Sequence, residues 1–375
     1  MHEPTSPADL LRLREAVEPY PIEPSDEEIA RATGIPVERV VRFDLNTLGD
    51  GPLPGVIDAL ARFDPRRAVE YGDPSYRQLR AAISGAVGAE PGCIIPGAGA
   101  DELIRLVTTM IVGAGDTVVI PTPTFAMFAV EARLAGARVV EVPRRTLATR
   151  QGVADIRAAV EANAARLVWL CSPNNPTADL YPLHELAALA DGLRAVVVVD
   201  AIYQEFAEAS LGLSPEALSP IPLQANLPNL LVLRSLAKAY GLAGARVGYL
   251  VTSPALAARF DAARLPLSIG SPSEASALGA LADRETARAR HRLIVGERER
   301  LAAACIALGW DVLDSVTNFI LVRPPDAIGL AETLARDGLV LRGYPPGPLG
   351  SWLRITARAP HENDRLLAAI AADRA

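Results

Sequence analysis

Short apolar runs alternate with helical patterns through the middle of the chain. Each run is three or four residues long and leads into a turn or a polar residue; the runs are residues 118–120, 167–170, 196–199 and 230–233. Between the runs, apolar positions recur with helical spacing, as at residues 103, 106, 107, 110 and 111. Buried strands that alternate with helices are typical of a parallel sheet with helices on both faces. We therefore predict an α/β domain whose active groups lie in the loops after the carboxyl ends of the strands.

The last third of the chain has a different pattern. A long, charge-rich helix is predicted at about residues 272–308, followed by a strand at residues 316–322 and a helix near residues 328–337. Two short strand-like segments follow, at residues 339–341 and 352–356. This order indicates a small α+β domain. The predicted fold class is α/β, with a large domain whose mostly parallel sheet is flanked by helices and a small α+β domain after it.

The first forty residues are too short to fold alone. They carry helical signals at residues 9–17 and 26–33 around a proline-rich turn at residues 19–24. We expect this segment to pack on the C-terminal domain or on a partner subunit. The predicted organisation is an N-terminal segment at residues 1–42, a large domain at residues 43–268 and a small domain at residues 269–375.

Composition narrows the class of protein. The 375 residues are 50% hydrophobic and 22% charged, which excludes disorder as the main state. The formal net charge of −7 leaves no net basic surface to neutralise a phosphate backbone, so we expect no nucleic-acid partner. Apolar runs such as residues 301–308 are far shorter than the roughly 18–20 residues that span a bilayer. The N-terminus lacks the basic and then apolar order of a signal peptide, so we expect a cytoplasmic protein with no membrane partner.

The three cysteines, Cys93, Cys171 and Cys305, lie far apart among apolar or small neighbours. Closely spaced cysteines would instead suggest a metal site or a redox motif. We therefore expect buried, inert thiols and no metal site.

A run of small residues precedes one of the helical patterns. Residues 97–102 read Gly-Ala-Gly-Ala-Asp-Glu and follow an apolar strand. Small residues let the backbone approach an anion, and the helix that follows directs free N–H groups and its positive dipole end at that anion. An ordinary tight turn has the same composition, so this segment alone does not identify a phosphate site.

Lys238 is the only lysine in the sequence, and it lies in a glycine-rich segment just after the apolar run at residues 230–233. Its amine can form a Schiff base with a carbonyl compound, which arginine cannot. A surface lysine at the start of a helix is the alternative. Ser235 and Arg246 favour a functional role, because a hydroxyl and a guanidinium are what a phosphate monoester needs.

Two further strand ends carry polar residues. Asp200 ends the run at residues 196–199, and Tyr203 follows three positions later. An acid at the tip of an apolar strand is typical either of a functional group or of a salt bridge, and both stay open here. Residues 172–177, Ser-Pro-Asn-Asn-Pro-Thr, close another apolar run and make a good turn sequence.

Taken in order, these segments resemble the fold-type I pyridoxal-phosphate aminotransferases of class I and II, most closely the histidinol-phosphate aminotransferase branch. The resemblance covers nearly the whole chain. The matching segments are residues 19–20, 71–74, 97–102, 121–125, 174–177, 200–203, 235–248, 352–356 and 362–364. Each motif is weak alone, whereas their order and spacing together are specific.

The resemblance implies a role for each residue around the cofactor, pyridoxal 5′-phosphate. Lys238 matches the Schiff-base lysine, whose freed amine moves the proton at the substrate α-carbon. Asp200 matches the acid that keeps the pyridinium nitrogen protonated, which makes the ring an electron sink. Asn175 and Tyr203 match the pair that hydrogen-bonds the 3′-oxygen of the ring. Phe125 stands at the position of the residue that stacks on the ring.

The resemblance also implies the contacts of the phosphate and the substrate. Ala100, Asp101, Ser235 and Arg246 match the phosphate-binding group, and Tyr71 is expected to reach in from the neighbouring subunit of a homodimer. The implied substrate contacts are Tyr20, Asn46 and Arg354.

Arg354 matches the arginine that holds the acidic group of the substrate, a carboxylate or a phosphate. In a strand at residues 352–356, period-two alternation places it on the same face as Trp352 and Thr356, which we take to be the face toward the cleft. Its planar fork of donors suits an acidic group. The alternatives are a salt-bridged arginine at the domain surface and, for Tyr20, an aromatic anchor of the N-terminal segment.

The chain departs from the family pattern at several positions. Phe125 stands where tyrosine is more common, and Ala237 where serine is often found, so each position lacks a hydroxyl. The family's Asp-Glu-Ala-Tyr is Asp-Ala-Ile-Tyr at residues 200–203, which keeps both ring contacts. The Asn-Glu-Asn-Pro segment near the substrate is reduced to Asn-Thr-Leu-Gly at residues 46–49, which leaves the substrate open.

We therefore expect an aminotransferase that moves an amino group between an amino donor, histidinol phosphate or a related amine, and a 2-oxo acid by a ping-pong mechanism. A decarboxylase of amino-acid O-phosphates, similar to threonine-phosphate decarboxylase, is the alternative with the same cofactor. A non-catalytic regulatory protein of this fold would have lost Lys238 or Asp200, and both are present. A nucleotide-dependent oxidoreductase needs its glycine-rich turn after the first strand, whereas residues 97–101 come almost 100 residues into the chain.

Overall fold

The computed structural model describes residues 23–373. The strands in this range are β1 (Val41–Arg42), β2 (Ile94–Gly97), β3 (Thr117–Thr122), β4 (Arg138–Pro143), β5 (Leu167–Cys171), β6 (Val196–Asp200), β7 (Leu230–Ser235), β8 (Gly248–Val251), β9 (Asp311–Val312), β10 (Phe319–Arg323), β11 (Leu339–Val340) and β12 (Leu353–Thr356). The α-helices are α1 (Asp26–Thr33), α2 (Pro54–Ala61), α3 (Arg77–Val87), α4 (Gly99–Ile111), α5 (Met127–Leu134), α6 (Val153–Ala162), α7 (Leu183–Ala190), α8 (Gln204–Leu211), α9 (Pro215–Leu218), α10 (Pro254–Ala263), α11 (Ser271–Ala282), α12 (Arg284–Ala307), α13 (Ala327–Arg336) and α14 (Pro360–Asp373). Short 3-10 helices lie at Val37–Arg39, Pro65–Ala68, Pro91–Cys93 and Ile221–Ala225.

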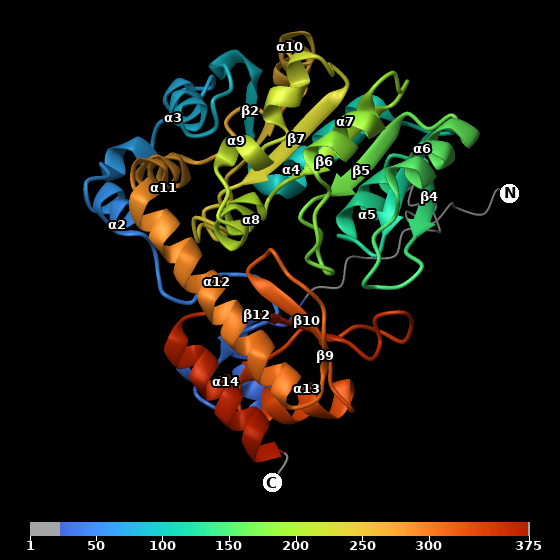
Figure 1. The fold of residues 1–375 in the computed structure, drawn as a ribbon. Helices are drawn as coiled ribbons and strands as arrows, with labels where there is room; N and C mark the ends of the chain where they lie inside the picture. The colour runs from blue at the N-terminus through green and yellow to red at the C-terminus, as the bar shows by residue number, and fades with distance from the viewer. Residues whose placement is uncertain (1–22, 374–375) are drawn as a thin grey trace, which may run out of the picture.

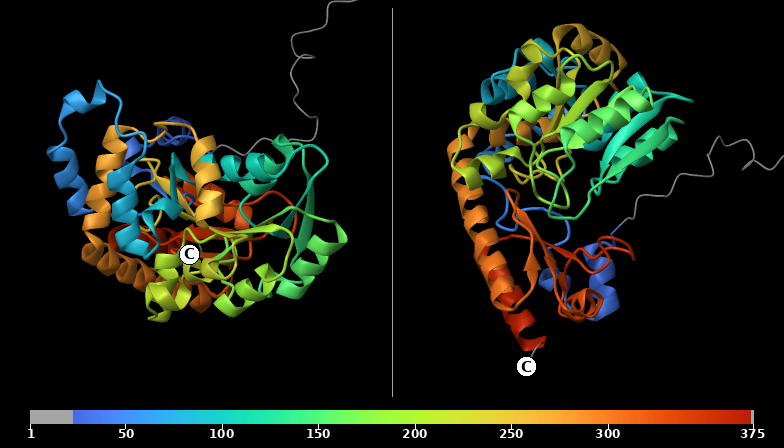
Figure 2. Two further views of the ribbon diagram at one scale, coloured as in Figure 1. Left: turned by 90° about the horizontal axis from the view of Figure 1, so that it is seen from above. Right: turned by 45° about the vertical axis from the view of Figure 1, so that its right-hand side comes forward.

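The larger half of the molecule is built on a seven-stranded sheet with the order β2-β8-β7-β6-β5-β3-β4. The strands from β7 to β4 run parallel, and β8 is antiparallel to both β2 and β7. Helices lie on both faces of this sheet (Figure 1 and Figure 2). The predicted α/β fold with a mostly parallel sheet is therefore confirmed.

Neighbouring residues of the central strands are buried on opposite faces of the sheet. Val197 and Val199 belong to one apolar cluster and Val198 to the other, and Leu231 and Val232 divide in the same way. Side chains alternate along a strand, so a strand that is covered on both faces must be apolar at every position. This requirement explains the uninterrupted apolar runs in the sequence.

The smaller half contains an antiparallel sheet in which β10 lies between β12 and β9. The first described strand, β1, pairs in parallel with β11, and α1 packs on α13. The long helix α12 extends from the larger half, where it packs on α8, to β9, β10 and α14 of the smaller half (Figure 1). The domain boundaries at residues 42 and 268 stay predictions.

The prediction of one continuous helix at residues 272–308 is wrong. The segment forms two helices. It is divided into α11 and α12 at Asp283, whose φ of −100° and ψ of 45° are not helical. The Asp283 carboxylate accepts a hydrogen bond from the N–H of Gly55 at 3.0 Å, and hydrogen bonding with Thr286 and Gly55 lowers its pKa. An aspartate that bonds to backbone in this way favours a helix start over a helix interior.

The structure bears on the expected burial of the cysteines and on the length of the apolar helices. Cys171 and Cys305 are buried, but Cys93 is partly exposed, so the expectation of three buried thiols is wrong for Cys93. The described cysteines are free. None of the helices in residues 23–373 is long and apolar enough to cross a membrane.

Candidate active site

A cavity of about 230 Å³ lies beside the first turn of α4 and the ends of three strands. Cys171, Asp200 and Ser235 are the last residues of β5, β6 and β7, and all three line it. This is the edge at which a parallel sheet places its ligands. The lining residues in the described chain are Glu23, Asp44, Leu45, Asn46, Ala100, Asp101, Phe125, Cys171, Asn175, Asp200, Ile202, Tyr203, Ser235, Ala237, Lys238, Ala243, Arg246 and Arg354.

Lys238 follows β7 by three residues and reaches the loop after β1. Its Nζ donates a hydrogen bond to the backbone oxygen of Leu45 at 2.7 Å. Burial, and then the positive charge of Arg354, lower the pKa of Lys238 from its ordinary value to about 8. An amine with this pKa has a much larger neutral fraction near neutral pH than an ordinary lysine, and the neutral form is the nucleophile.

Asp200 is the buried acid of the cavity, with 3% of its surface exposed. Its Oδ1 accepts a hydrogen bond from the N–H of Ile202 at 3.1 Å. Burial raises the pKa of Asp200 to about 7. A nearby positive group on a bound molecule would reverse this shift and hold the carboxylate charged.

Tyr203 directly precedes α8, and its hydroxyl is bonded by a residue in the loop after β1. Asn46 Nδ2 donates a hydrogen bond to the Tyr203 hydroxyl oxygen at 2.8 Å. Burial raises the pKa of Tyr203 above its ordinary value. The hydroxyl therefore stays protonated at neutral pH and keeps a proton to donate.

The first turn of α4 forms one corner of the cavity and suits an anion. The N–H groups of Ala100 and Asp101 have no partners within the helix, because they belong to its first turn. Arg246 Nη2 contacts Asp101 Oδ2 at 2.8 Å, and Ser235 is buried beside them in the cavity wall. Gly99 has a φ of +79°, a backbone conformation that favours glycine, and a Cβ there would lie 2.7 Å from Arg246 Nη2.

Arg354, a residue of β12, also lines the cavity. Its Nη1 donates to Asn175 Oδ1 at 2.6 Å, and its Nη2 donates to the backbone oxygen of Asp44. The guanidinium lies 5.5 Å from the centroid of the Phe319 ring, and its buried Nε has no hydrogen-bond partner. A buried donor without a partner in a cavity wall suits a ligand with an acidic group.

Trp352 directly precedes β12, and its ring packs against Arg323 of β10. The pairing of β10 with β12 is compatible with the predicted shared face of Trp352, Arg354 and Thr356. The Trp352 ring lines a second cavity of about 1150 Å³. Phe125 lines both cavities, with its ring 5.7 Å from that of Phe128 in an edge-to-face contact. Thr356 turns to the loop after β1, where its hydroxyl contacts Asn46.

Eleven of the predicted site residues lie together in the smaller cavity wall: Asn46, Ala100, Asp101, Phe125, Asn175, Asp200, Tyr203, Ser235, Lys238, Arg246 and Arg354. Tyr71 is not among them and is 90% exposed in this single chain. Tyr20 lies outside the described residues.

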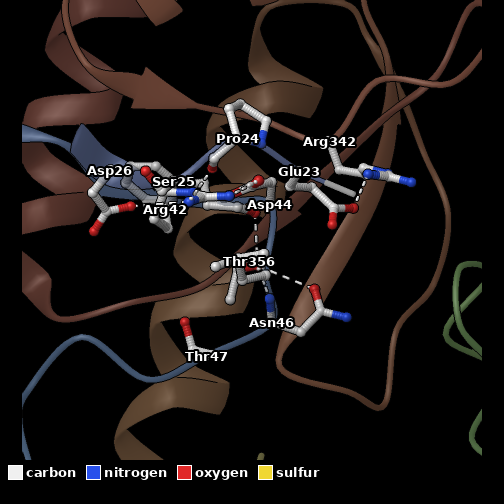
Figure 3. Close-up of polar contacts among 12 residues, drawn as sticks. Glu23, Pro24, Ser25, Asp26, Arg42, Asp44, Asn46, Thr47, Arg342 and Thr356 are labelled. Carbon is white, nitrogen blue, oxygen red and sulfur yellow. Dashed lines mark hydrogen bonds and ion pairs between the residues drawn. The ribbon is translucent and has the colours of Figure 1, made fainter. Parts of the chain in front are cut away.

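Sequence reasoning missed several residues of this cavity. Leu45 and Asp44 contribute backbone oxygens, for which no side-chain signal exists. Glu23 lines the cavity and pairs with Arg342 (Figure 3). Cys171 was treated as an inert thiol, although its place before the turn at residues 172–177 put it at a strand end.

The fold and the site define a known class of enzyme. The family model for aminotransferase class I and II matches residues 38–372. The chain belongs to this family.

Relatives point to a narrower group within it. A histidinol-phosphate aminotransferase of Roseiflexus castenholzii is 38% identical over 365 residues, which are 94% of this chain and 94% of that protein. Another, of Stenotrophomonas maltophilia, is 38% identical over 317 residues, with 81% and 84% covered. The crystal structure of histidinol-phosphate aminotransferase from Sinorhizobium meliloti in complex with pyridoxal-5′-phosphate matches with a TM-score of 0.83 at 29% identity and covers 93% of this chain and 94% of that one.

Proposed function

We propose that this protein is a pyridoxal-phosphate-dependent aminotransferase similar to the histidinol-phosphate aminotransferases. The observation that carries the proposal is the position of the only lysine of the chain. Lys238 lies in one cavity with the buried acid Asp200 and an anion-binding helix start, and burial makes its amine unusually acidic. The family and its relatives support the same function.

The cavity fits the cofactor at several points. Asp200, a buried acid, is held charged by a protonated ring nitrogen. The N–H groups at the start of α4, with Ser235 and Arg246, suit a phosphate. Lys238 supplies the amine for the carbonyl carbon, and Asn175 and Tyr203 supply donors for the ring oxygen. Phe125 supplies an aromatic side chain in the wall for stacking on the ring.

Bound pyridoxal phosphate supplies an electron sink that stabilises negative charge on the substrate α-carbon. The side chains of the protein handle the proton. Lys238, with a pKa of about 8, would take the proton from the substrate α-carbon as a neutral amine and, as an ammonium, would deliver it to the former carbonyl carbon of the cofactor. The backbone oxygen of Leu45 holds the Nζ when the amine is free.

The amino donor that we propose is histidinol phosphate or a related amino compound, and the acceptor is a 2-oxo acid. Arg354 supports an acidic donor, because its Nε is buried in the cavity wall without a partner. Glu23 also lines the cavity, and its carboxylate is paired with Arg342. Because the segment at residues 46–49 differs from the family pattern, the proposal includes related amino compounds as donors.

A homodimer in the cytoplasm is also part of the proposal. Tyr71 is 90% exposed, and the apolar side chains of Val69 and Leu265 are 83% and 64% exposed. Their two segments are joined by a hydrogen bond from Arg264 to the backbone oxygen of Pro74. An exposed apolar area of this kind is typical of a subunit interface. In a homodimer, Tyr71 would reach the cavity of the neighbouring subunit.

Amino transfer and decarboxylation are separated by one assay. Purified protein is incubated with pyridoxal phosphate, histidinol phosphate and 2-oxoglutarate, and formation of glutamate is followed. Amino-acid O-phosphates are tested in parallel for release of carbon dioxide. We expect glutamate that depends on the oxo acid; carbon dioxide without amino transfer would contradict the proposal.

A further inference from the structure

We infer that Asn46 is a positioning residue, which fixes the hydroxyl of Tyr203 in the direction of the cofactor. The inference rests on the proposed function, because it assigns to Tyr203 a contact with the bound ring. The observation behind it is the hydrogen bond of 2.8 Å from Asn46 Nδ2 to the Tyr203 hydroxyl oxygen. This bond joins residues 157 positions apart in the chain, from the loop after β1 to the start of α8.

Asn46 is itself held rigidly. It is 1% exposed, and its φ of 54° lies in the left-handed region, which asparagine tolerates better than most residues. Its N–H donates to Thr356 Oγ1 at 3.0 Å, and its backbone oxygen accepts from Asn318 Nδ2 at 3.1 Å (Figure 3 shows the contact with Thr356). Thr356 of β12 and Asn318, the residue before β10, thus fix a residue that reaches into the site.

The two residues before Asn46 also bond to side chains of the cavity. The backbone oxygen of Asp44 accepts from Arg354, and that of Leu45 accepts from Lys238 at 2.7 Å. Three consecutive residues therefore each contact a different side chain of the cavity. A loop with three such contacts sets the relative positions of those side chains.

Both polar atoms of the Asn46 side chain are already engaged. Nδ2 donates to Tyr203, and Oδ1 lies 3.1 Å from Thr356 Oγ1. These two bonds fix the orientation of the amide and direct one of its two N–H groups at Tyr203. This arrangement favours an action through Tyr203.

The direction of the hydrogen bond decides what Asn46 does. An amide donates and a phenol oxygen accepts, so the Tyr203 proton is left for another acceptor. A donated N–H also stabilises negative charge on the phenol oxygen and makes its O–H a stronger donor. Tyr203 then stabilises the ionised ring oxygen of the cofactor, which lowers the pKa at which its visible absorbance titrates.

The test is a pH titration of the visible absorbance of the holoenzyme, together with kcat and KM. Wild type is compared with Asn46→Gly, with Tyr203→Phe and with the double variant. Glycine accepts the same backbone conformation and removes only the amide. Asn229→Gly is the matched control. The Asn229 amide donates to three backbone oxygens at N···O distances of 3.0 to 3.2 Å, and Asn229 does not line the cavity.

We expect Asn46→Gly to raise the spectroscopic pKa by about one unit, the scale of one hydrogen bond, and to lower kcat more than it raises KM. The change should add nothing in the Tyr203→Phe background, and Asn229→Gly should lower only the melting temperature. An equal shift in both backgrounds, or a loss of stability with no shift, would overturn the inference.

A second variant keeps the test decisive if the glycine variant fails to fold. Asn46→Asp is nearly isosteric and replaces the donor by an acceptor, so the Tyr203 proton turns away from the cofactor. We expect a larger rise in the spectroscopic pKa in the wild-type background than in the Tyr203→Phe background, and equal rises would contradict the inference. A wild-type protein that takes up no pyridoxal phosphate would refute the proposed function instead.

Discussion

Replacing Arg354 by alanine tests the substrate-binding side of the cavity. The side chain is 8% exposed and bridges two elements, with Nη1 on Asn175 Oδ1 and Nη2 on the backbone oxygen of Asp44. If it also holds the acidic group of the substrate, its loss removes one partner of a buried charge pair. Such losses amount to roughly 2–4 kcal/mol of transition-state stabilisation, which is about 30- to 1,000-fold in kcat/KM.

The same change has a structural cost that must be separated from the catalytic one. Two acceptors lose a donor, and each loss costs about 1–3 kcal/mol unless water replaces the donor. Arg298→Ala is the matched control. Arg298 is 5% exposed and also joins separate parts of the chain, because it donates to the backbone oxygen of Thr317, the hydroxyl of Ser210 and the carboxylate of Glu299, but it does not line the cavity.

The assay is amino transfer from histidinol phosphate, with thermal unfolding of both variants measured alongside. We expect both variants to melt at lower temperature and only Arg354→Ala to lose kcat/KM, with the bound cofactor still visible. The pKa of Lys238 should rise above about 8, because the positive charge that helps to lower it is gone. A kcat/KM within about threefold of wild type, or equal losses in both variants, would refute the substrate role.

Three further predictions concern the cofactor-binding residues and the dimer. In cofactor-free protein the pKa of Lys238 is lowered from 10.5 to about 8, so between these pH values the unfolded state binds more protons than the folded state. The free energy of unfolding should therefore rise with pH in this range, by roughly 1–3 kcal/mol in denaturant titrations, and Lys238→Met should abolish the rise. Asp200→Asn should lower kcat by about 100-fold or more while cofactor-free protein at pH 8 becomes no less stable, because a buried charge is removed; undiminished kcat would contradict its role. Co-expressed Lys238→Ala and Tyr71→Ala chains should regain activity in hybrid dimers, since one of the two sites is then intact, and hybrids no more active than the parents would show that Tyr71 acts within its own subunit.

The central sheet could be predicted because burial on both faces leaves a direct mark on the sequence. The four apolar runs became β3, β5, β6 and β7, and the rule that ligands bind at the carboxyl ends of parallel strands brought Asp200 and Ser235 to one edge. Lys238 stood out because no other lysine competes with it. Composition and spacing carry this kind of information well.

Other features depend on contacts that no local pattern records. Asp283 divides the predicted helix because it bonds to Gly55, more than 200 residues earlier in the chain. Leu45 contacts Lys238 through a backbone oxygen, which every residue type possesses. Each of these results from tertiary packing.

Reduction of the holoenzyme with borohydride tests the central claim most directly. Protein incubated with pyridoxal phosphate should absorb in the visible or near-ultraviolet, and reduction should fix the cofactor to the chain. Because Lys238 is the only lysine, peptide mapping has one predicted side-chain amine to find. We predict one cofactor per chain on the peptide that contains Lys238. A protein that stays colourless with the cofactor, or that carries the label on another peptide, would contradict the account.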